Sequence, residues 1–407
     1  MPPASRTALH SAAAPVPAVG DGRFQAGRVL VTAAAHAVHD MYTAFLAPLL
    51  PHFIAVLALS KTQAGTLTVF MQFPSLLQPA IGHLADRYAL RAIVILAPAA
   101  AGILMSLLGV ISSYVMLAVL LTLTGLVSAG LHSVGPVMVG RHSGAALGRG
   151  MSLWMVGGEL GRTVGPLLIV SAIGEGSILN ASWLMIFGLL ASGLLYLVLR
   201  RGPEPTVAVR LEQPLPVRTA LRSMGPFLLP LSLILALPML LNVALTTYLP
   251  TFLTEEGDSL QLAGVALAIL QAAGVAGALL GGSISDRIGR RPSLAGAMLV
   301  APLLLLIFLT VEGMARLPLL ILMGFFTLAI TPVIMALVQE SYPENRALAN
   351  GIYMALSFTI RSGAVIVLGL LADGLGMPTA FIISAALALL GVPAVALLPG
   401  RNNDRTR

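Results

Sequence analysis

The chain has 407 residues, of which 57% are apolar and only 10% are charged, and its mean hydropathy is +0.94. This composition excludes an ordinary soluble globular protein and indicates an integral membrane protein. The formal net charge of +7 does not indicate nucleic acid binding, because the arginines concentrate in alternate loops, and the absence of cysteine excludes disulfides and thiolate metal sites.

A helix that crosses the hydrocarbon core of a bilayer needs roughly 20 apolar residues. The sequence contains twelve stretches of this kind, so we predict an all-α integral membrane protein with twelve transmembrane helices in two pseudo-symmetric six-helix bundles. The predicted spans are 28–55, 62–82, 91–111, 114–139, 148–173 and 179–200, followed by 226–253, 261–283, 292–311, 315–339, 346–372 and 377–399.

The segments outside the spans differ in composition from the spans. Residues 1–27 are rich in alanine, proline and serine, which predicts a disordered tail. Residues 201–225 are rich in proline and charge, which predicts a cytoplasmic linker. This divides the chain into an amino-terminal bundle at 28–200 and a carboxy-terminal bundle at 226–400, with a second short tail at 401–407.

Charge is distributed unequally between the two sides of the predicted membrane. One set of alternate loops carries most of the arginines, whereas the opposite loops hold only Lys61 and Arg316 among several carboxylates. Because cytoplasmic loops carry an excess of basic residues, we expect both termini to be cytoplasmic. The predicted location is a bacterial inner membrane.

The first span contains an ionisable cluster. Asp40 lies well inside this span, His36 precedes it by one helical turn, and His39 is adjacent. A charge at this depth costs about 2.5 to 3.5 kcal/mol, so it seldom persists without a task. Because imidazole titrates near neutral pH, we predict that Asp40, His36 and His39, with Glu159 on the fifth span, carry a coupling proton. A static hydrogen bond between helices is the alternative, and His and Asp at this spacing do not predict a metal site.

Two hairpins repeat one charged framework. The hairpin after the second span reads Gly82-His-Leu-Ala-Asp86-Arg87-Tyr-Ala-Leu-Arg91, and 200 residues later the chain reads Gly282-Ser-Ile-Ser-Asp286-Arg287-Ile-Gly-Arg290-Arg291. Two copies at corresponding places indicate a duplicated transporter architecture. Both copies resemble the signature of the major facilitator superfamily. We predict that Gly82, Asp86, Arg87, Arg91, Gly282, Asp286, Arg287 and Arg291 control the conformational state, and a loop that only sets topology is the alternative.

A glycine stripe lies on the fifth span. Gly157, Gly161 and Gly165 recur every four residues and predict a flat face for close helix packing. With Pro166, the stretch resembles the antiporter motif of the same superfamily, which implies export. Helix packing alone is the alternative.

Three segments resemble one branch of the superfamily, the fosmidomycin-resistance transporters. These segments are His36-Ala-Val-His39-Asp40-Met41, Leu77-Gln78-Pro79 and Gln339-Glu340-Ser-Tyr-Pro343-Glu-Asn345-Arg346. The resemblance implies a proton-driven exporter of small amphiphilic or anionic compounds. The chain departs from the branch at His39, where asparagine is usual, and at the charged positions Glu159, Arg162 and Arg361.

Two arginines occupy nearly equivalent positions in the two halves, Arg162 on the fifth span and Arg361 on the eleventh. Guanidinium groups form paired hydrogen bonds with carboxylates and phosphates, so the pair predicts an anionic substrate. Neutralisation of Arg162 by Glu159, three residues earlier, is the alternative. Further substrate-binding candidates are polar residues on apolar helices, namely His132, Gln72, Gln271, Asn242, Tyr353 and Ser357.

The sequence contains no phosphate-binding loop, zinc-protease helix or nucleophile elbow. We therefore expect neither enzymatic activity nor a cofactor. The predicted function is secondary active transport of a small organic solute by alternating access, as proton-coupled efflux from a monomer whose partners are the solute, protons and the lipid bilayer. Proton-coupled uptake of an organic anion and a lipid or lysolipid flippase are the alternatives.

Overall fold

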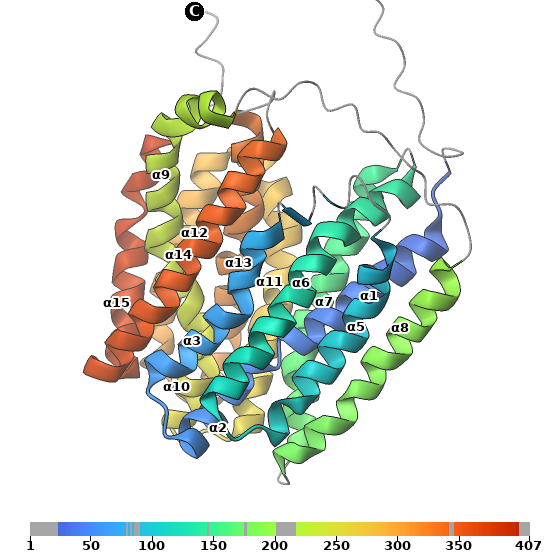
Figure 1. The fold of residues 1–407 in the computed structure, drawn as a ribbon. Helices are drawn as coiled ribbons and strands as arrows, with labels where there is room; N and C mark the ends of the chain where they lie inside the picture. The colour runs from blue at the N-terminus through green and yellow to red at the C-terminus, as the bar shows by residue number, and fades with distance from the viewer. Residues whose placement is uncertain are drawn as a thin grey trace, which may run out of the picture.

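The computed structural model describes residues 23–78, 80–81, 84, 90–144, 146–174, 177–200, 217–341 and 346–398, and for 147–148, 217–228, 339–340 and 346–351 it describes the backbone alone. Within these ranges the chain is helical and contains no strand, which confirms the predicted all-α fold. The helices stand side by side in two groups (Figure 1).

The two groups correspond to the two halves of the sequence. The first half comprises α1 (Ala26–Thr43), α2 (Leu46–Leu57), α3 (Lys61–Gln72), η1 (Phe73–Leu77), α5 (Arg91–Ser106), η2 (Leu107–Val110), α6 (Tyr114–Ser143), α7 (Leu147–Ile173), η3 (Ile178–Leu184) and α8 (Met185–Leu199). The second half comprises α9 (Val217–Val243), the π-helical η4 (Ala244–Tyr248), α10 (Leu249–Glu255), α11 (Leu260–Ile288), α12 (Arg290–Phe308), η5 (Gly313–Ala315), α13 (Arg316–Ser341), α14 (Arg346–Leu375), α15 (Met377–Leu390) and η7 (Pro393–Leu397).

Eleven helical segments in the described part of the chain are long and apolar enough to cross a membrane. The remaining predicted span, 62–82, is formed by α3 and η1, and its end lies partly outside the described residues. Since a helix satisfies its backbone hydrogen bonds internally, these segments make the chain a multi-pass membrane protein. One boundary differs from the prediction, because α9 begins at Val217 inside the stretch predicted as linker.

The first span of each half is interrupted near its middle. α1 ends at Thr43 and α2 begins at Leu46, with Ala44 and Phe45 between them. In the second half the helix changes to π geometry at Ala244, 200 residues further along the chain. π-helical turns frequently occur at functional sites. In each half, the irregular backbone therefore directly follows a helical turn that carries polar side chains.

Each half contains two hydrophobic clusters that pack at different depths. In the first half, Val29 and Trp154 belong to one cluster and Tyr42 to the other. Asp40 lies between these clusters along α1, and Arg361 has the same position along α14 in the second half. Both charged groups are therefore held at middle depth by apolar packing above and below.

The halves contact each other along two helix pairs. α3 packs along α14, as Figure 1 shows, and α7 packs along α11. A Cβ added at Gly65 or Gly369 would collide with the hydroxyl of Tyr248. That hydroxyl lies 3.0 Å from the carbonyl oxygen of Lys61 and 3.1 Å from that of Val365. Glycine therefore allows the backbones of the two halves to approach closely here.

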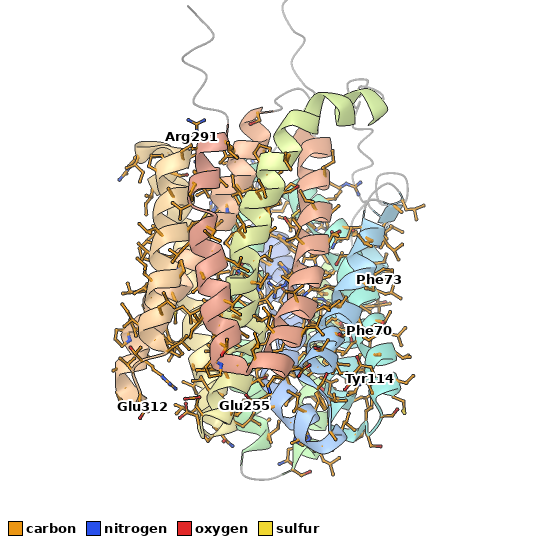
Figure 2. All side chains as sticks on the ribbon, turned by 90° about the vertical axis from the view of Figure 1, so that its left-hand side faces the viewer. Phe70, Phe73, Tyr114, Glu255, Arg291 and Glu312 are labelled. Atoms are coloured by element: carbon orange, nitrogen blue, oxygen red, sulfur yellow. The ribbon has the colours of Figure 1, made fainter. Side chains whose placement is uncertain are left out.

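A carboxylate of the second half caps a helix of the first. Asp373 accepts hydrogen bonds from the backbone N–H of Lys61 at 2.7 Å, from the backbone N–H of Thr62 at 3.0 Å and from the Thr62 hydroxyl at 2.6 Å. The ammonium group of Lys61 also pairs with Glu255 at 3.0 Å. We call these four residues the interhalf cap. It lies at the end of the molecule that carries Glu255, opposite the end that carries Arg291 (Figure 2).

At the Arg291 end, one arginine in each half forms a hydrogen bond between two helices of that half. Arg91, at the start of α5, donates to the carbonyl oxygen of Leu199 at the end of α8, at 2.7 Å. Arg291, near the start of α12, donates to the carbonyl oxygen of Leu398 after η7. Each arginine thus ties the third span of its half to the sixth.

Candidate functional site

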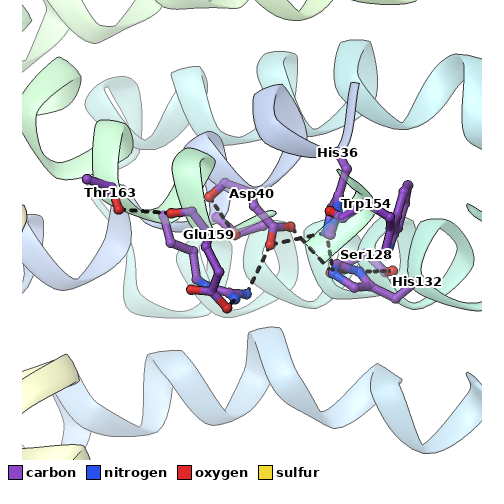
Figure 3. A network of polar contacts seen from close by, with 9 residues as sticks. His36, Asp40, Ser128, His132, Trp154, Glu159 and Thr163 are labelled. Carbon is purple, nitrogen blue, oxygen red and sulfur yellow. Dashed lines mark hydrogen bonds and ion pairs between the residues drawn. The ribbon is translucent and has the colours of Figure 1, made fainter. Parts of the chain in front are cut away.

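A polar cluster joins α1 to α6 and α7 inside the first half (Figure 3). The Nε2 atoms of His36 and His132 are 3.2 Å apart. Asp40 places Oδ2 at 3.4 Å from Nε2 of His36 and Oδ1 at 3.5 Å from Nε2 of His132. His36 and Asp40 are 4% and 2% exposed, whereas the His132 side chain is 29% exposed. His132 is therefore the member of this trio with a substantial exposed surface.

Backbone carbonyl groups determine the tautomers of both imidazoles. Nδ1 of His36 lies 2.9 Å from the carbonyl oxygen of Trp154, and Nδ1 of His132 lies 2.9 Å from that of Ser128. A carbonyl oxygen can only accept, so each Nδ1 carries the hydrogen and each neutral ring turns the lone pair of Nε2 toward Asp40. Three hydrogen-bond acceptors thus face one another, an arrangement that one added proton stabilises.

His39 lies beside the trio without entering its hydrogen bonds. Its ring is fully buried, its centroid is 5.9 Å from that of His132, and neither ring nitrogen has a well-formed hydrogen bond. The sequence prediction grouped His39 with His36 and Asp40 for the proton and assigned His132 to the substrate. The structure instead places His132 against Asp40.

The carboxylate of Asp40 also faces α7. Arg162 donates from Nη1 to Oδ2 of Asp40 at 3.1 Å, and its Nη2 pairs with Glu159 one turn earlier. The arginine is therefore paired with two carboxylates, as the alternative interpretation of the sequence anticipated for Glu159. Taken together, Asp40, Glu159 and Arg162 carry one net negative charge when both imidazoles are neutral.

The glycine stripe brings α7 close enough to α1 for these contacts. Cβ atoms added at Gly157, Gly161 and Gly165 would meet backbone carbonyl oxygens of α1. Beside the stripe, a Cβ at Gly158 would meet the ring of His36 and, at 3.1 Å, Oδ2 of Asp40. The predicted packing role of the stripe is thereby confirmed.

Arg361 has a different environment on α14. It donates to Oδ1 of Asn242 at 2.6 Å, to the hydroxyl of Thr246 at 3.1 Å and to that of Thr247 at 3.4 Å. Within the described part of the chain, no carboxylate pairs with Arg361. Its charge is therefore solvated by neutral groups but not neutralised.

The other predicted substrate residues are dispersed. Gln72 ends α3 with a buried Oε1 that has no hydrogen-bond partner, and Gln271 is partly exposed on α11. Tyr353 is 4% exposed and packs in an apolar cluster, one turn before Ser357. Within the described structure, none of these four forms a hydrogen bond or ion pair with Asp40 or Arg361.

The predicted gating residues fall into two groups. Gly82, Asp86 and Arg87 lie outside the described residues. In the second copy, Asp286 pairs with Arg290 at 2.6 Å, Arg287 is exposed, and Gly282 faces open space. The second copy therefore contains the ion pair between Asp286 and Arg290 in addition to the hydrogen bond from Arg291 to Leu398.

Several groups in the site have weak sequence signals. Ser128 and the Trp154 carbonyl orient the imidazoles, and Thr247 extends the Arg361 contacts, but hydroxyl groups and carbonyls are too common on helices to indicate a site. The spacing of Ser128 and His132, one helical turn, is the signal that links them.

A duplicated array of membrane-crossing helices, with buried charged groups at middle depth in both halves, defines a membrane transporter rather than an enzyme. The model of the Major Facilitator Superfamily matches residues 32–357, and the chain belongs to this family. It is a secondary transporter.

Curated relatives match over most of the chain. The fosmidomycin resistance protein of Escherichia coli (strain K12) is 26% identical over 385 residues, which cover 91% of this chain and 92% of that protein. A probable 4-methylmuconolactone transporter of Cupriavidus pinatubonensis is 25% identical over 368 residues, which cover 84% of each chain.

Solved structures share the fold. A bacterial homolog of the human lysosomal transporter Spinster, in an inward-facing and unoccupied conformation, aligns with a TM-score of 0.72 and 16% identity over 93% of this chain and 95% of that one. A D-xylose-proton symporter aligns with the same TM-score and 15% identity over 93% and 99% of the two chains. At these identities the comparison shows the fold alone.

Proposed function

We propose that the chain is a proton-coupled exporter of a small organic anion or anionic amphiphile. The observation that carries the proposal is the convergence of Asp40 with two imidazoles whose Nε2 lone pairs face it. Such a group binds one proton with little rearrangement and without leaving a charge unpaired in the membrane.

The charge count supports a proton as the coupling ion. Asp40, Glu159 and Arg162 together have one net negative charge. One proton shared among His36, His132 and Asp40 makes the cluster neutral. Release of that proton restores a negative charge beside Arg162, and this alternation is the electrostatic basis for coupling.

Arg361 is the proposed anion-binding residue. Its three partners in the described structure, Asn242, Thr246 and Thr247, are neutral. A substrate carboxylate or phosphate placed beside Arg361 would add a charge-assisted hydrogen bond and neutralise the guanidinium charge. Arg162 is a weaker candidate for anion binding because its guanidinium already pairs with the carboxylates of Asp40 and Glu159.

Two observations support the outward direction. The Escherichia coli relative is named a resistance protein, and the glycine stripe on α7 resembles the antiporter motif. By the distribution of basic loops, the Arg291 end is proposed to face the cytoplasm of a bacterial inner membrane, with the interhalf cap on the outer face.

Reconstituted vesicles test the proposal directly. Purified protein in liposomes that contain a pH-sensitive dye should move protons in response to organic anions, added as a panel of carboxylates, phosphonates and lysolipids. Asp40→Asn should abolish the proton movement but retain exchange of the substrate with itself, because the helices remain packed while the titrating group is lost.

Asp258→Asn, in the loop before α11, is the matched control and should leave proton movement unchanged. Proton movement in Asp40→Asn equal to that of the unsubstituted protein would contradict the proposed coupling. Lipid movement with no solute-dependent proton flux would contradict an exporter of anions and favour a flippase.

A further inference from the structure

The trio of His36, His132 and Asp40 has the dimensions of a metal site. The Nε2 atoms of His36 and His132 are 3.2 Å apart, and each lies near a different oxygen of Asp40, at 3.4 Å from Oδ2 and 3.5 Å from Oδ1, respectively. One ligand atom from each of the three residues lies within 4.8 Å of the other two. A tetrahedral ion with bonds of about 2.0 to 2.1 Å has ligand atoms about 3.3 Å apart, so a small rotation of the carboxylate would complete three corners of such a coordination shell.

The hydrogen bonds that these three side chains make with groups outside the trio match those of typical metal ligands. A metal-bound histidine usually donates its other ring N–H to a backbone carbonyl or carboxylate, and a bound carboxylate usually accepts a hydrogen bond in turn. His36 and His132 donate from Nδ1 to carbonyl oxygens, and Oδ2 of Asp40 accepts from Arg162. Oδ1 of Asp40 is the oxygen on the His132 side.

A fourth ligand position is available near the trio. The side chain of His132 is 29% exposed, so one side of the trio is open to a fourth ligand. His39 lies next to the trio, with its ring centroid 5.9 Å from that of His132, and its ring nitrogens have no well-formed hydrogen bond.

We propose that His36, His132 and Asp40 bind a divalent transition-metal ion, with zinc, cobalt and nickel as the fitting class. Two imidazoles and one carboxylate suit these ions, whereas calcium and magnesium require mostly oxygen ligands. The ion would occupy the position of the shared proton, so metal and proton compete. The site itself does not depend on the direction of transport or on the identity of the substrate.

Cobalt provides a direct spectroscopic test. Tag-free protein, purified in detergent and treated with a chelator, should develop the intense visible d–d absorption of tetrahedral cobalt, saturating at one ion per chain and reversed by zinc. His36→Ala and His132→Ala should each weaken cobalt binding by about 100-fold or more, because each removes one ligand.

His52→Ala, which removes a histidine of α2 outside the trio, is the matched control and should bind cobalt normally. A Trp183→Phe background adds a second readout, because Trp154 stacks on His36 with ring centroids 3.8 Å apart. Zinc should change Trp154 fluorescence there even if an alanine variant fails to fold. No saturable cobalt band, an undiminished band in folded His132→Ala, or a Trp154 signal that responds to pH but not to zinc would overturn the proposal.

Discussion

The two buried charges differ in what surrounds them. Asp40 faces two imidazoles and a guanidinium, whereas Arg361 faces an amide and two hydroxyl groups. A charge with titratable partners can exchange protons at little cost, and a charge with neutral partners keeps its attraction for an external ion. This contrast is the basis on which we propose that the proton binds in the first half and the anion in the second.

Trp154 should report proton binding. In a Trp183→Phe protein, its fluorescence should fall as the pH is lowered, because a proton on Nε2 of His36 places a cation against the stacked indole ring. The groups that face this proton are His132, Asp40 and, further away, Arg162.

Fluorescence titration of the same protein with Asp40→Asn provides the comparison, and the pH response should shift or disappear. An identical response in both proteins would mean that the carboxylate does not share the proton.

Replacement of Arg361 and of Arg162 should have unequal effects on the affinity for organic anions. Arg361→Gln should weaken binding of an organic anion by about 10- to 100-fold, the equivalent of one hydrogen bond to a charged group. Calorimetry with anionic and neutral ligands of similar size provides the measurement.

Arg162→Gln should instead lower thermal stability, because it leaves Asp40 and Glu159 without their cation. Arg200→Gln, at an exposed position after α8, serves as a control for both. Equal losses of affinity in the Arg162 and Arg361 variants would contradict the assignment of the anion to one half.

Helix spacing determines whether the charged groups meet. The contact between α1 and α7 places backbone against backbone at Gly161, so Arg162 reaches Asp40 from the next position along α7. A wider spacing would remove the ion pair while leaving every ionisable residue in place.

Gly161→Ala should therefore reduce coupling without a change of charge. The added methyl group meets the Ala37 carbonyl and should cost about 1 to 3 kcal/mol, as overpacking generally does. The measurements are thermal unfolding and proton movement in vesicles. Gly193→Ala on α8, where an added Cβ meets nothing within 4 Å, is the control, and equal behaviour of the two variants would contradict the packing argument.

The sequence predicts these helices well because their apolar length is a local property. Composition and length are sufficient for the spans, and the repeated hairpins indicate the duplication. The meeting of His36 with His132, 96 residues apart, depends on how α1 and α6 cross. No local pattern contains that information, so the sequence alone does not predict that His132 lies against Asp40.

On the scale of the whole molecule, hydrogen bonds and an ion pair between the halves gather at the Glu255 end of the described structure. They include the interhalf cap and the hydrogen bond from Gln261 to the carbonyl oxygen of Gly174, at 2.5 Å. This arrangement closes the two halves against each other at that end. Alternating access requires these contacts to break when the opposite end closes.

Asp373→Asn should shift the population toward a form open at the Glu255 end. Loss of the negative cap on α3 should cost about 1 kcal/mol, enough to change a two-state ratio about fivefold. Distances between spin labels on α3 and α14 should lengthen in a larger fraction of molecules. Glu312→Gln, at the same end but outside the cap, is the control, and unchanged distance distributions in Asp373→Asn would exclude the cap as a latch.

The arginine contacts at the Arg291 end have a consequence for how the chain can be divided. Arg91 and Arg291 bind carbonyl groups within their own half, so in each half the contact between the third span and the sixth is made without a residue from the other half. A gene cut between the codons for α8 and α9 should yield two polypeptides that insert separately and reassemble when coexpressed. The covalent connection would then be dispensable for assembly, and its role would be to keep the two pieces in equal number.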